Sequence, residues 1–419
     1  MSPQTNPSSP SQQHYAQLLE DAAKIKGMSL GKDAWRRLLR NRAALAAMLF
    51  LIFVAISSLF VSLIPLQSPK QQLLKDRIFT SPEAVSRTLQ VIRPGGDSEL
   101  VSFSDVLYEL DQEVDRQCKQ LEQQLVTSTD SDERDSIQQK IEGEQAKNQK
   151  LMDQLWARPG RWDRALIRLR IAIFGDWCLP SVCGTDQTGR DELARILWGS
   201  RVSLIVGLVS TLVSLVIGVS YGAISGYMGG LVDDVMMRIV DILYSIPFIF
   251  VVIFIISILD SPEIKEVLLA RGIDKIVIFY ILIGAIYWLT MARVVRGQVI
   301  SLKNEQFVEA ARAIGASRLR IVFRHLVPNL LSVVIVYLTL TIPSVMLFEA
   351  FLSFLGLGVE PPQVSWGMLA SDGIDAVTPV RVVWWLVVFP GLALASTLFA
   401  LNFLGDGLRD ALDPRLKNK

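Results

Sequence analysis

Apolar runs and charged segments alternate along this chain of 419 residues, and several runs are long enough to cross a bilayer. A transmembrane helix needs about 20 mainly apolar residues. Stretches without charged residues lie between Arg42 and Lys70, Arg201 and Asp233, Asp241 and Asp260, Lys275 and Arg293, Arg324 and Glu349, and Arg381 and Asp406. The third and fourth are short, so their ends are the least defined. The pattern predicts an all-α integral membrane protein with about six transmembrane helices.

The order of the runs divides the chain into five predicted parts. These are a cytoplasmic N-terminal segment at 1–42, a first transmembrane helix at 43–65, an external segment at 66–200, a transmembrane core at 201–404 and a cytoplasmic tail at 405–419. A hydrophobic share of 51% and a mean hydropathy of +0.37 agree with a membrane protein. Residues 1–28 are polar and are expected to be loosely attached. Ser29 to Arg42 favours a basic helix on the inner surface, with Trp35 at headgroup depth.

Lysine and arginine set the predicted orientation, because they concentrate in cytoplasmic loops. They gather before the first span, between the fourth and fifth spans, and after the sixth. Both termini are therefore expected on the cytoplasmic side. The loop between the second and third spans agrees least, since Arg238 is outnumbered by Asp233, Asp234 and Asp241. Acidic residues count little in this rule, so the orientation is kept.

The external segment contains a predicted helical hairpin at 102–156. Leu110, Val114, Leu121 and Leu125 follow heptad-like spacing, and Ile137 and Ile141 continue apolar positions after the polar turn TSTDSD. The hairpin is interpreted as a solvated structural insertion or as a docking surface for a partner. Both interpretations stay open.

Enzyme chemistry has little support in the sequence. GMSLGKD, from Gly27, is one residue short of a phosphate loop, and Asp33 stands where a hydroxyl should bind magnesium. With only two histidines, a catalytic triad or a metal site is not expected. Cys178 and Cys183 bracket CLPSVC on the predicted outer face, where a small disulfide loop is plausible. No nucleic-acid partner is indicated, because the charges are segregated around the spans.

The predicted spans hold almost no ionisable groups at membrane depth, which a carrier or channel needs for its coupling ion. Pro247, Pro343 and Pro390 are either gating kinks or ordinary membrane prolines. The chain thus looks like a conduit without its own energy source. A self-sufficient carrier and a membrane scaffold or sensor that uses the external hairpin are the alternatives.

The segment EAARAIGASRLRIVFRHLVPN, from Glu309 to Asn329, lies on the predicted cytoplasmic side between two spans. Glu309 to Ile314 predicts a short helix, and Gly315 tolerates a backbone angle that ends it. Apolar residues are expected to anchor the basic helix that follows, namely Leu319, Ile321, Val322 and Phe323. Pro328 suits the first turn of the next span. The segment is interpreted as a lever that receives force from a soluble partner, or as a simple amphipathic connector.

This segment resembles the EAA loop of binding-protein-dependent ABC importers, with Val327 where leucine is usual. Three further stretches are similar to the second, C-type permease of the oligopeptide/dipeptide/nickel family: GTDQTGRDELARILWGSRVSL from Gly184, FLSFLGLGVEPPQVSWG from Phe351 and NFLGDGLRDALDPRLK from Asn402. The resemblance covers roughly Ser29 to Pro65 and Cys183 to Lys417. The hairpin departs from it, because most family members have a much shorter loop there.

The resemblance implies a type I ABC importer permease fold in a bacterial inner membrane and a peptide-like substrate. It implies a homologous second permease, two cytoplasmic ATP-binding subunits and a periplasmic substrate-binding protein as partners, with ATP bound by the partners and no cofactor or catalytic residue in this chain. The implied coupling loop is 309–328, with Glu309, Ala310, Ala311, Gly315 and Pro328 in the motif, and Arg312 and Arg318 as candidate ATPase contacts. The motif before the second span comprises Gly184, Thr185, Asp186, Gly189, Arg190 and Asp191, for which a structural turn with a helix-capping aspartate is favoured. Gly356, Gly358 and Trp366 lie in a predicted external loop with tight backbone packing near the headgroups, and they are candidates for an outer gate.

Overall fold

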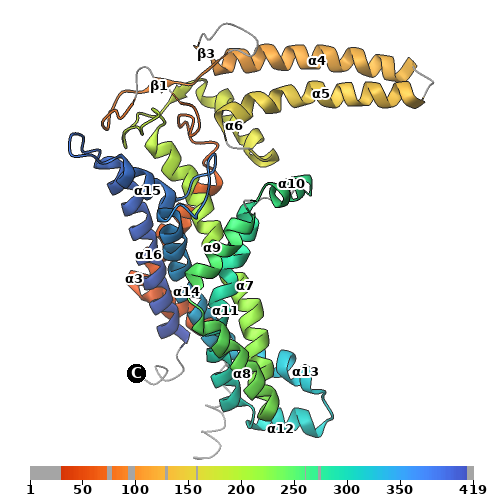
Figure 1. The fold of residues 1–419 in the computed structure, drawn as a ribbon, viewed down its shortest axis with the longest axis vertical. Helices are drawn as coiled ribbons and strands as arrows, with labels where there is room; N and C mark the ends of the chain where they lie inside the picture. The colour runs from red at the N-terminus through yellow and green to blue at the C-terminus, as the bar shows by residue number, and fades with distance from the viewer. Residues whose placement is uncertain are drawn as a thin grey trace, which may run out of the picture.

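The computed structural model describes residues 30–72, 78–92, 100–127, 131–156, 159–259, 261–271 and 275–412. The polar residues 1–28 of the predicted N-terminal segment, the centre of the hairpin turn and the end of the tail from Asp413 lie outside these residues. A bundle of long helices carries a separate cap at one end, and the cap extends a helical hairpin sideways (Figure 1).

Five helices in the described residues are long and apolar enough to cross a membrane. They are α3 (Arg42–Leu59), α7 (Glu192–Met228), α11 (Lys275–Leu302), α14 (Val327–Phe354) and α16 (Trp385–Leu412). Helices α8 (Gly230–Ser245) and α9 (Phe248–Leu259), bent by 79° at the break between them, meet the same criterion together and make a sixth candidate span. The predicted number of spans is confirmed.

Proline explains the bend between α8 and α9. Ile246 has an extended backbone (φ −80°, ψ 123°), the conformation that a following proline imposes. Pro247 supplies no N–H and cannot continue the α8 ladder. Pro343 and Pro390 instead lie inside α14 and α16, which pass through them without ending.

Small residues allow α7 to approach its neighbours closely. A Cβ added at Gly222 would lie 2.3 Å from the carbonyl oxygen of Ala292 in α11. Small side chains at helix contacts are how membrane helices gain packing without a hydrophobic driving force. Helix α7 also packs against α3, α14 and α15 (Trp366–Ala376), so it is central to the bundle.

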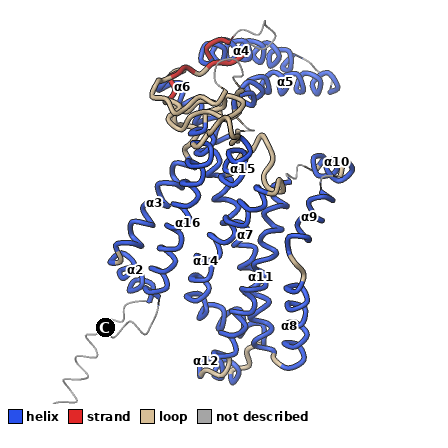
Figure 2. Tube along the Cα trace, turned by 60° about the vertical axis from the view of Figure 1, so that its left-hand side comes forward, coloured by secondary structure: helices blue, strands red, loops and turns tan. Residues whose placement is uncertain are grey.

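Helix α2 (Leu30–Arg40) and the last turns of α16 lie toward the same end of the bundle as α12 (Gln306–Ala313) (Figure 2). Leu38, Ala44 and Ala411 form a buried cluster there, and Trp35 is exposed. Helix α16 continues through Gly405 and Gly407 to Leu412. A Cβ at Gly407 would lie 2.3 Å from that of Ala44, so this glycine permits helix contact inside α16.

The cap contains short strands that the sequence pattern did not predict. Strand β1 (Arg87–Thr88) pairs antiparallel with β4 (Trp177–Cys178), and β2 (Gln90–Ile92) pairs antiparallel with β3 (Leu100–Ser102). The remaining described helices are α6 (Arg161–Phe174), α10 (Pro262–Ala270), α13 (Arg318–Arg320), the π-helix η1 (Ile321–Leu326) and α15 (Trp366–Ala376).

The predicted hairpin is confirmed as α4 (Phe103–Thr127) and α5 (Ser131–Leu155). Its seam contains Val114 and Cys118 from α4 and Ile137 and Ile141 from α5. A second cluster at its base includes Phe103 and joins the hairpin to β2, α6 and β4. The hairpin therefore has its own packed interior and a fixed base.

Candidate coupling site

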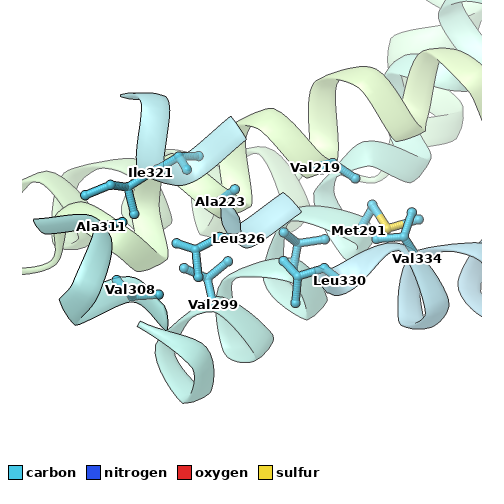
Figure 3. Packing of buried hydrophobic residues seen from close by; sticks show 12 residues of the cluster. Val219, Ala223, Met291, Val299, Val308, Ala311, Ile321, Leu326, Leu330 and Val334 are labelled. Atoms are coloured by element: carbon cyan, nitrogen blue, oxygen red, sulfur yellow. The ribbon is translucent and has the colours of Figure 1, made fainter. Parts of the chain in front are cut away.

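Helix α12 is seated on the bundle by one of its faces. Val308 and Ala311 are buried, three residues apart, which places them on the same side of the helix. They join a cluster that includes Val299 of α11, Ala223 of α7 and Leu326 of η1 (Figure 3). Glu309 and Ala310 lie on the exposed side. The predicted short helix is confirmed, and it presents two residues of the EAA motif outward.

Gly315 ends α12 through a Schellman motif. Its φ is +81°, and its N–H donates to the carbonyl of Arg312 at 2.9 Å. The N–H of Ala316 donates to the carbonyl of Ala311 at 3.0 Å, and this is the hydrogen bond of the motif that spans more residues. Only glycine adopts this φ without a steric cost from Cβ. The predicted break at Gly315 is confirmed, with Ile314 83% exposed at the turn.

The second arm of the segment, α13 and η1, runs directly into α14. Ile321 and Val322 are buried as predicted. The prediction is wrong for Leu319 and Phe323, which are 55% and 45% exposed, because the arm turns a single face to the bundle. Pro328 lies in the first turn of α14, as predicted. Together with Ile314, the two exposed residues leave an apolar surface at this end of the protein.

Arg312 braces α12 against the end of α7. Its Nε donates to Tyr227 Oη at 3.3 Å, and its guanidinium carbon lies 5.4 Å from the Tyr227 ring centroid. One Nη donates to the carbonyl of Lys303 at 3.3 Å. The structure thus gives Arg312 contacts within the chain, and Arg318 is exposed on α13. Contact of either with an ATPase stays a prediction.

Asp186 is the centre of the motif before α7. Its Oδ1 accepts from the N–H groups of Thr188 and Arg190 at 2.8 and 2.9 Å. Its Oδ2 accepts from Arg190 Nε at 2.7 Å and from Arg195 Nη1 at 2.9 Å. Burial alone would raise the pKa of this carboxyl, but Arg195 and Arg190 outweigh it, and the pKa lies below its ordinary value. These contacts agree with the structural interpretation of the motif.

The same motif begins α7. Asp191 is the N-cap residue, and its Oδ1 accepts from the N–H of Ala194 at 2.7 Å, which confirms the predicted cap. Gly184 and Gly189 have φ of +75° and +78°. A Cβ at Gly184 would lie 2.7 Å from the Trp385 indole. Thr185 is buried, and its Oγ1 accepts from the N–H of Thr80 at 2.9 Å.

The predicted outer-gate residues lie where α14 turns toward α15. Gly356 has a φ of +73°, and a Cβ at Gly358 would overlap Ser353, so the close backbone packing is confirmed. Trp366 is buried, and its Nε1 donates to the carbonyl of Ile196 in α7 at 2.9 Å. Trp366 thus anchors α15 to α7. A role in gating stays a prediction.

Two family models match the chain. Residues 218–418 match the binding-protein-dependent transport system inner membrane component, and residues 29–82 match the N-terminal transmembrane domain of oligopeptide transport permease C. The oligopeptide transport system permease protein OppC of Escherichia coli (strain K12) is 52% identical over 232 residues, which cover 55% of this chain and 72% of that protein. The chain belongs to this permease family.

Other relatives of the permease extend the comparison. The dipeptide transport system permease protein DppC of Bacillus subtilis (strain 168) is 42% identical over 234 residues, covering 56% of the permease and 68% of that protein. A putative peptide transport system permease protein of Brucella suis is 37% identical over 262 residues, which cover 62% of this chain and 82% of that protein. Neither family model covers residues 83–217, which include the hairpin and α6.

Sequence reasoning missed a polar clamp next to the coupling site. Asp233 of α8 accepts from Arg296 Nε and Nη2 of α11, both at 2.6 Å, and also from the hydroxyl of Ser225 in α7. Three helices of the permease are joined at this carboxylate. The signal in the sequence was present only as charges at the predicted span ends, which do not indicate their partner.

Two polar contacts at the end of the bundle that carries the cap were also missed. Arg195 Nη2 donates to Asp372 Oδ2 of α15 at 2.9 Å. Glu349, which lies inside α14, is buried and accepts from the hydroxyls of Ser353 and Ser365 at 2.8 and 2.7 Å. Both contacts hold α15 in place.

The predicted disulfide is not formed in the structure. Cys178 and Cys183 are buried free thiols. Arg170 Nη2 donates to Cys178 Sγ at 3.1 Å, so the sulfur of Cys178 contacts this guanidinium and not Cys183. Burial raises the pKa of both thiols, that of Cys183 to about 12. Among the described residues, no group of histidine, cysteine and carboxylate side chains fits a metal ion.

Proposed function

We propose that the permease is the C-type transmembrane subunit of an ATP-driven importer of oligopeptides or dipeptides. It forms the translocation path with a homologous second permease in a bacterial inner membrane, with both termini in the cytoplasm. A substrate-binding protein delivers the peptide from outside. ATP is bound and hydrolysed by two cytoplasmic subunits, and this chain contributes no catalytic residue or cofactor. The names of its relatives support the substrate class.

The seating of α12 carries the coupling part of this proposal. One face of the helix is buried among residues of α7, α11 and η1. The other side and the adjoining turn present Glu309, Ala310 and the exposed apolar Ile314. An exposed apolar group rimmed by charged residues fits a protein partner. A partner that grips this side displaces α12 together with the helices beneath it.

The polar clamp supports the transmission of movement from α12 to the transmembrane helices. Asp233 and Arg296 join α8 to α11 close to where α12 is seated. Arg312 braces α12 to the end of α7 through Tyr227. When ATP binding draws the two ATPases together, the two loops approach each other, and the attached helices open the path outward.

The test is purification of the tagged chain in mild detergent, followed by reconstitution in liposomes. We expect a second permease and ATP-binding subunits to co-purify. With the binding protein added, the vesicles should accumulate radiolabelled peptide only when ATP reaches the ATPases. Uptake by the chain alone would instead establish a self-sufficient carrier. Recovery with external proteins only, and no uptake, would establish a scaffold.

A further inference from the structure

Helix α6 in the cap has a buried face, an exposed apolar face that adjoins it, and a charged face. Leu166, Ile167 and Arg170 are buried against the rest of the protein. Trp162, Leu169 and Ile173 lie on a second face, which we call the apolar stripe, and they are 54%, 48% and 58% exposed. Their spacing of seven and four residues keeps them on one side of the helix. Three large apolar side chains exposed on one side of a helix mark a surface that contacts a membrane or another protein.

The orientation of α6 is fixed by a polar contact in its first turn. Asp163 Oδ1 accepts from Arg201 Nη1 of α7 at 2.7 Å and from the hydroxyl of Ser62 at 2.5 Å. Arg201 Nε also donates to the carbonyl of Ser58 in α3 at 2.6 Å. This contact ties α6 to the outer ends of two transmembrane helices. The apolar stripe is therefore held in a defined direction.

The apolar stripe continues the outer surface of α3. Trp162 contacts Phe60, the residue that follows α3, with ring centroids 6.1 Å apart. Helix α3 is peripheral, with only 17% of its residues buried, and Phe53 and Ile56 are among its exposed apolar side chains. A peripheral spanning helix faces lipid, so the stripe begins where that lipid-facing surface ends.

A third face of α6 points toward the hairpin. Arg168 Nη2 donates to Asp111 Oδ1 of α4 at 2.9 Å. The hairpin itself is acidic: α4 contains six acidic and two basic residues, and α5 contains six acidic and four basic residues. The charged side of α6 thus meets the hairpin, and the apolar stripe lies on another side. Figure 1 shows α6 between the hairpin and the transmembrane bundle.

We propose that α6 is an interfacial helix that rests in the outer leaflet, with Trp162, Leu169 and Ile173 inserted among phospholipid chains. Helices of this kind lie in the membrane plane with their apolar face buried at the boundary of headgroups and acyl chains. Tryptophan is favoured at that depth. The function of α6 is to support the hairpin at a fixed height above the membrane surface. This inference rests on the chain being a membrane protein and not on its substrate.

Spin-label accessibility tests the proposal. The full chain, isolated from membranes with its partners, is placed in phospholipid nanodiscs after its three buried native cysteines are replaced by alanine. Single labels are attached at L169C and I173C. Collision rates are measured with molecular oxygen, which partitions into acyl chains, and with a nickel chelate, which stays in water. Two controls are R168C on the charged side of α6, and V126C on the hairpin, where the valine is 84% exposed.

We expect the oxygen-to-nickel collision ratio at positions 169 and 173 to exceed the ratio at positions 168 and 126 severalfold. Ratios equal to those of the controls would show that the stripe faces water and would overturn the proposal. Low collision rates with both reagents would show that protein covers the stripe, which would also overturn it. Because the four labelled positions are all exposed, misfolding of one variant leaves the comparison among the others intact.

Discussion

The φ of +81° at Gly315 makes this residue the sharpest place to test the coupling assignment. A Cβ added there would meet no atom within 4 Å, so substitution by alanine adds no clash within the chain. The remaining cost is conformational, because a left-handed backbone costs about 1–2 kcal/mol for a residue with a Cβ. Asparagine tolerates this region better than alanine does, although its side chain is larger.

A cost of about 1–2 kcal/mol changes a conformational equilibrium by a factor of about 5 to 30. At Gly315 this cost destabilises the Schellman motif. Because the motif joins α12 to the second arm, the position of α12 relative to η1 changes as well. We expect ATP-driven uptake to fall in the order wild type, Gly315→Asn, Gly315→Ala, with Gly315→Ala lowered by up to about this factor. Gly315→Asp adds a charge at the exposed turn, and we expect it to abolish uptake. All variants should reach the membrane in equal amounts.

The relative uptake of Gly315→Asn and Gly315→Ala shows whether backbone conformation or side-chain size limits this position. If Gly315→Asn transports less than Gly315→Ala, side-chain size and not backbone conformation limits the site, and the explanation through φ is refuted. Normal uptake by Gly315→Asp would refute the coupling role itself. Peptide accumulation in vesicles, normalised to the amount of permease and of co-purified ATPase, separates loss of coupling from loss of assembly.

Three further predictions follow from single residues. Glu309→Lys should abolish uptake yet leave the subunit in the membrane, because Glu309 is exposed; normal uptake would contradict the assignment. Asp186→Asn should lower the free energy of unfolding by about 3 kcal/mol, since it leaves Arg195 with one buried partner fewer. The pKa of Asp186 lies below its ordinary value, so its contribution to the free energy of unfolding is complete above about pH 4 and is lost as the pH falls further. Thermal unfolding of the protein in detergent should show this loss in the wild type and not in Asp186→Asn. Burial raises the pKa of Cys183 to about 12, so a maleimide at neutral pH should leave this thiol unmodified until the protein unfolds.

The spans could be predicted from the sequence because a bilayer requires long apolar helices, but their ends could not. Helix α7 begins at Glu192, nine residues before Arg201. Glu192 and Arg195 form a buried ion pair in its first turn. Helix α11 continues past Arg293, whose Nη2 pairs with Asp241 at 2.8 Å. A charged residue therefore does not by itself end a helix, because another residue of the chain can pair with it.

The same distinction applies to the two ends of the bundle. The helix end at Gly315 and the cap at Asp191 are each encoded within a few consecutive residues, so the sequence predicted both. The contact between Arg195 and Asp372 joins residues 177 apart, and no local pattern specifies it. The exposure of Leu319 could not be predicted either, because it depends on which face of the second arm meets the bundle.

Transmission across the membrane depends on α7, which contributes to both ends of the permease. Ala223 belongs to the cluster that seats α12, and Tyr227 contacts Arg312. Near the start of the same helix, Arg195 and the carbonyl of Ile196 hold α15. A displacement of α12 relative to α7 would open a packed cluster, so α12, α7 and α11 are expected to move as one body. Flexion is then concentrated where the packing is interrupted, at the 79° bend between α8 and α9, where a proline removes the backbone donor.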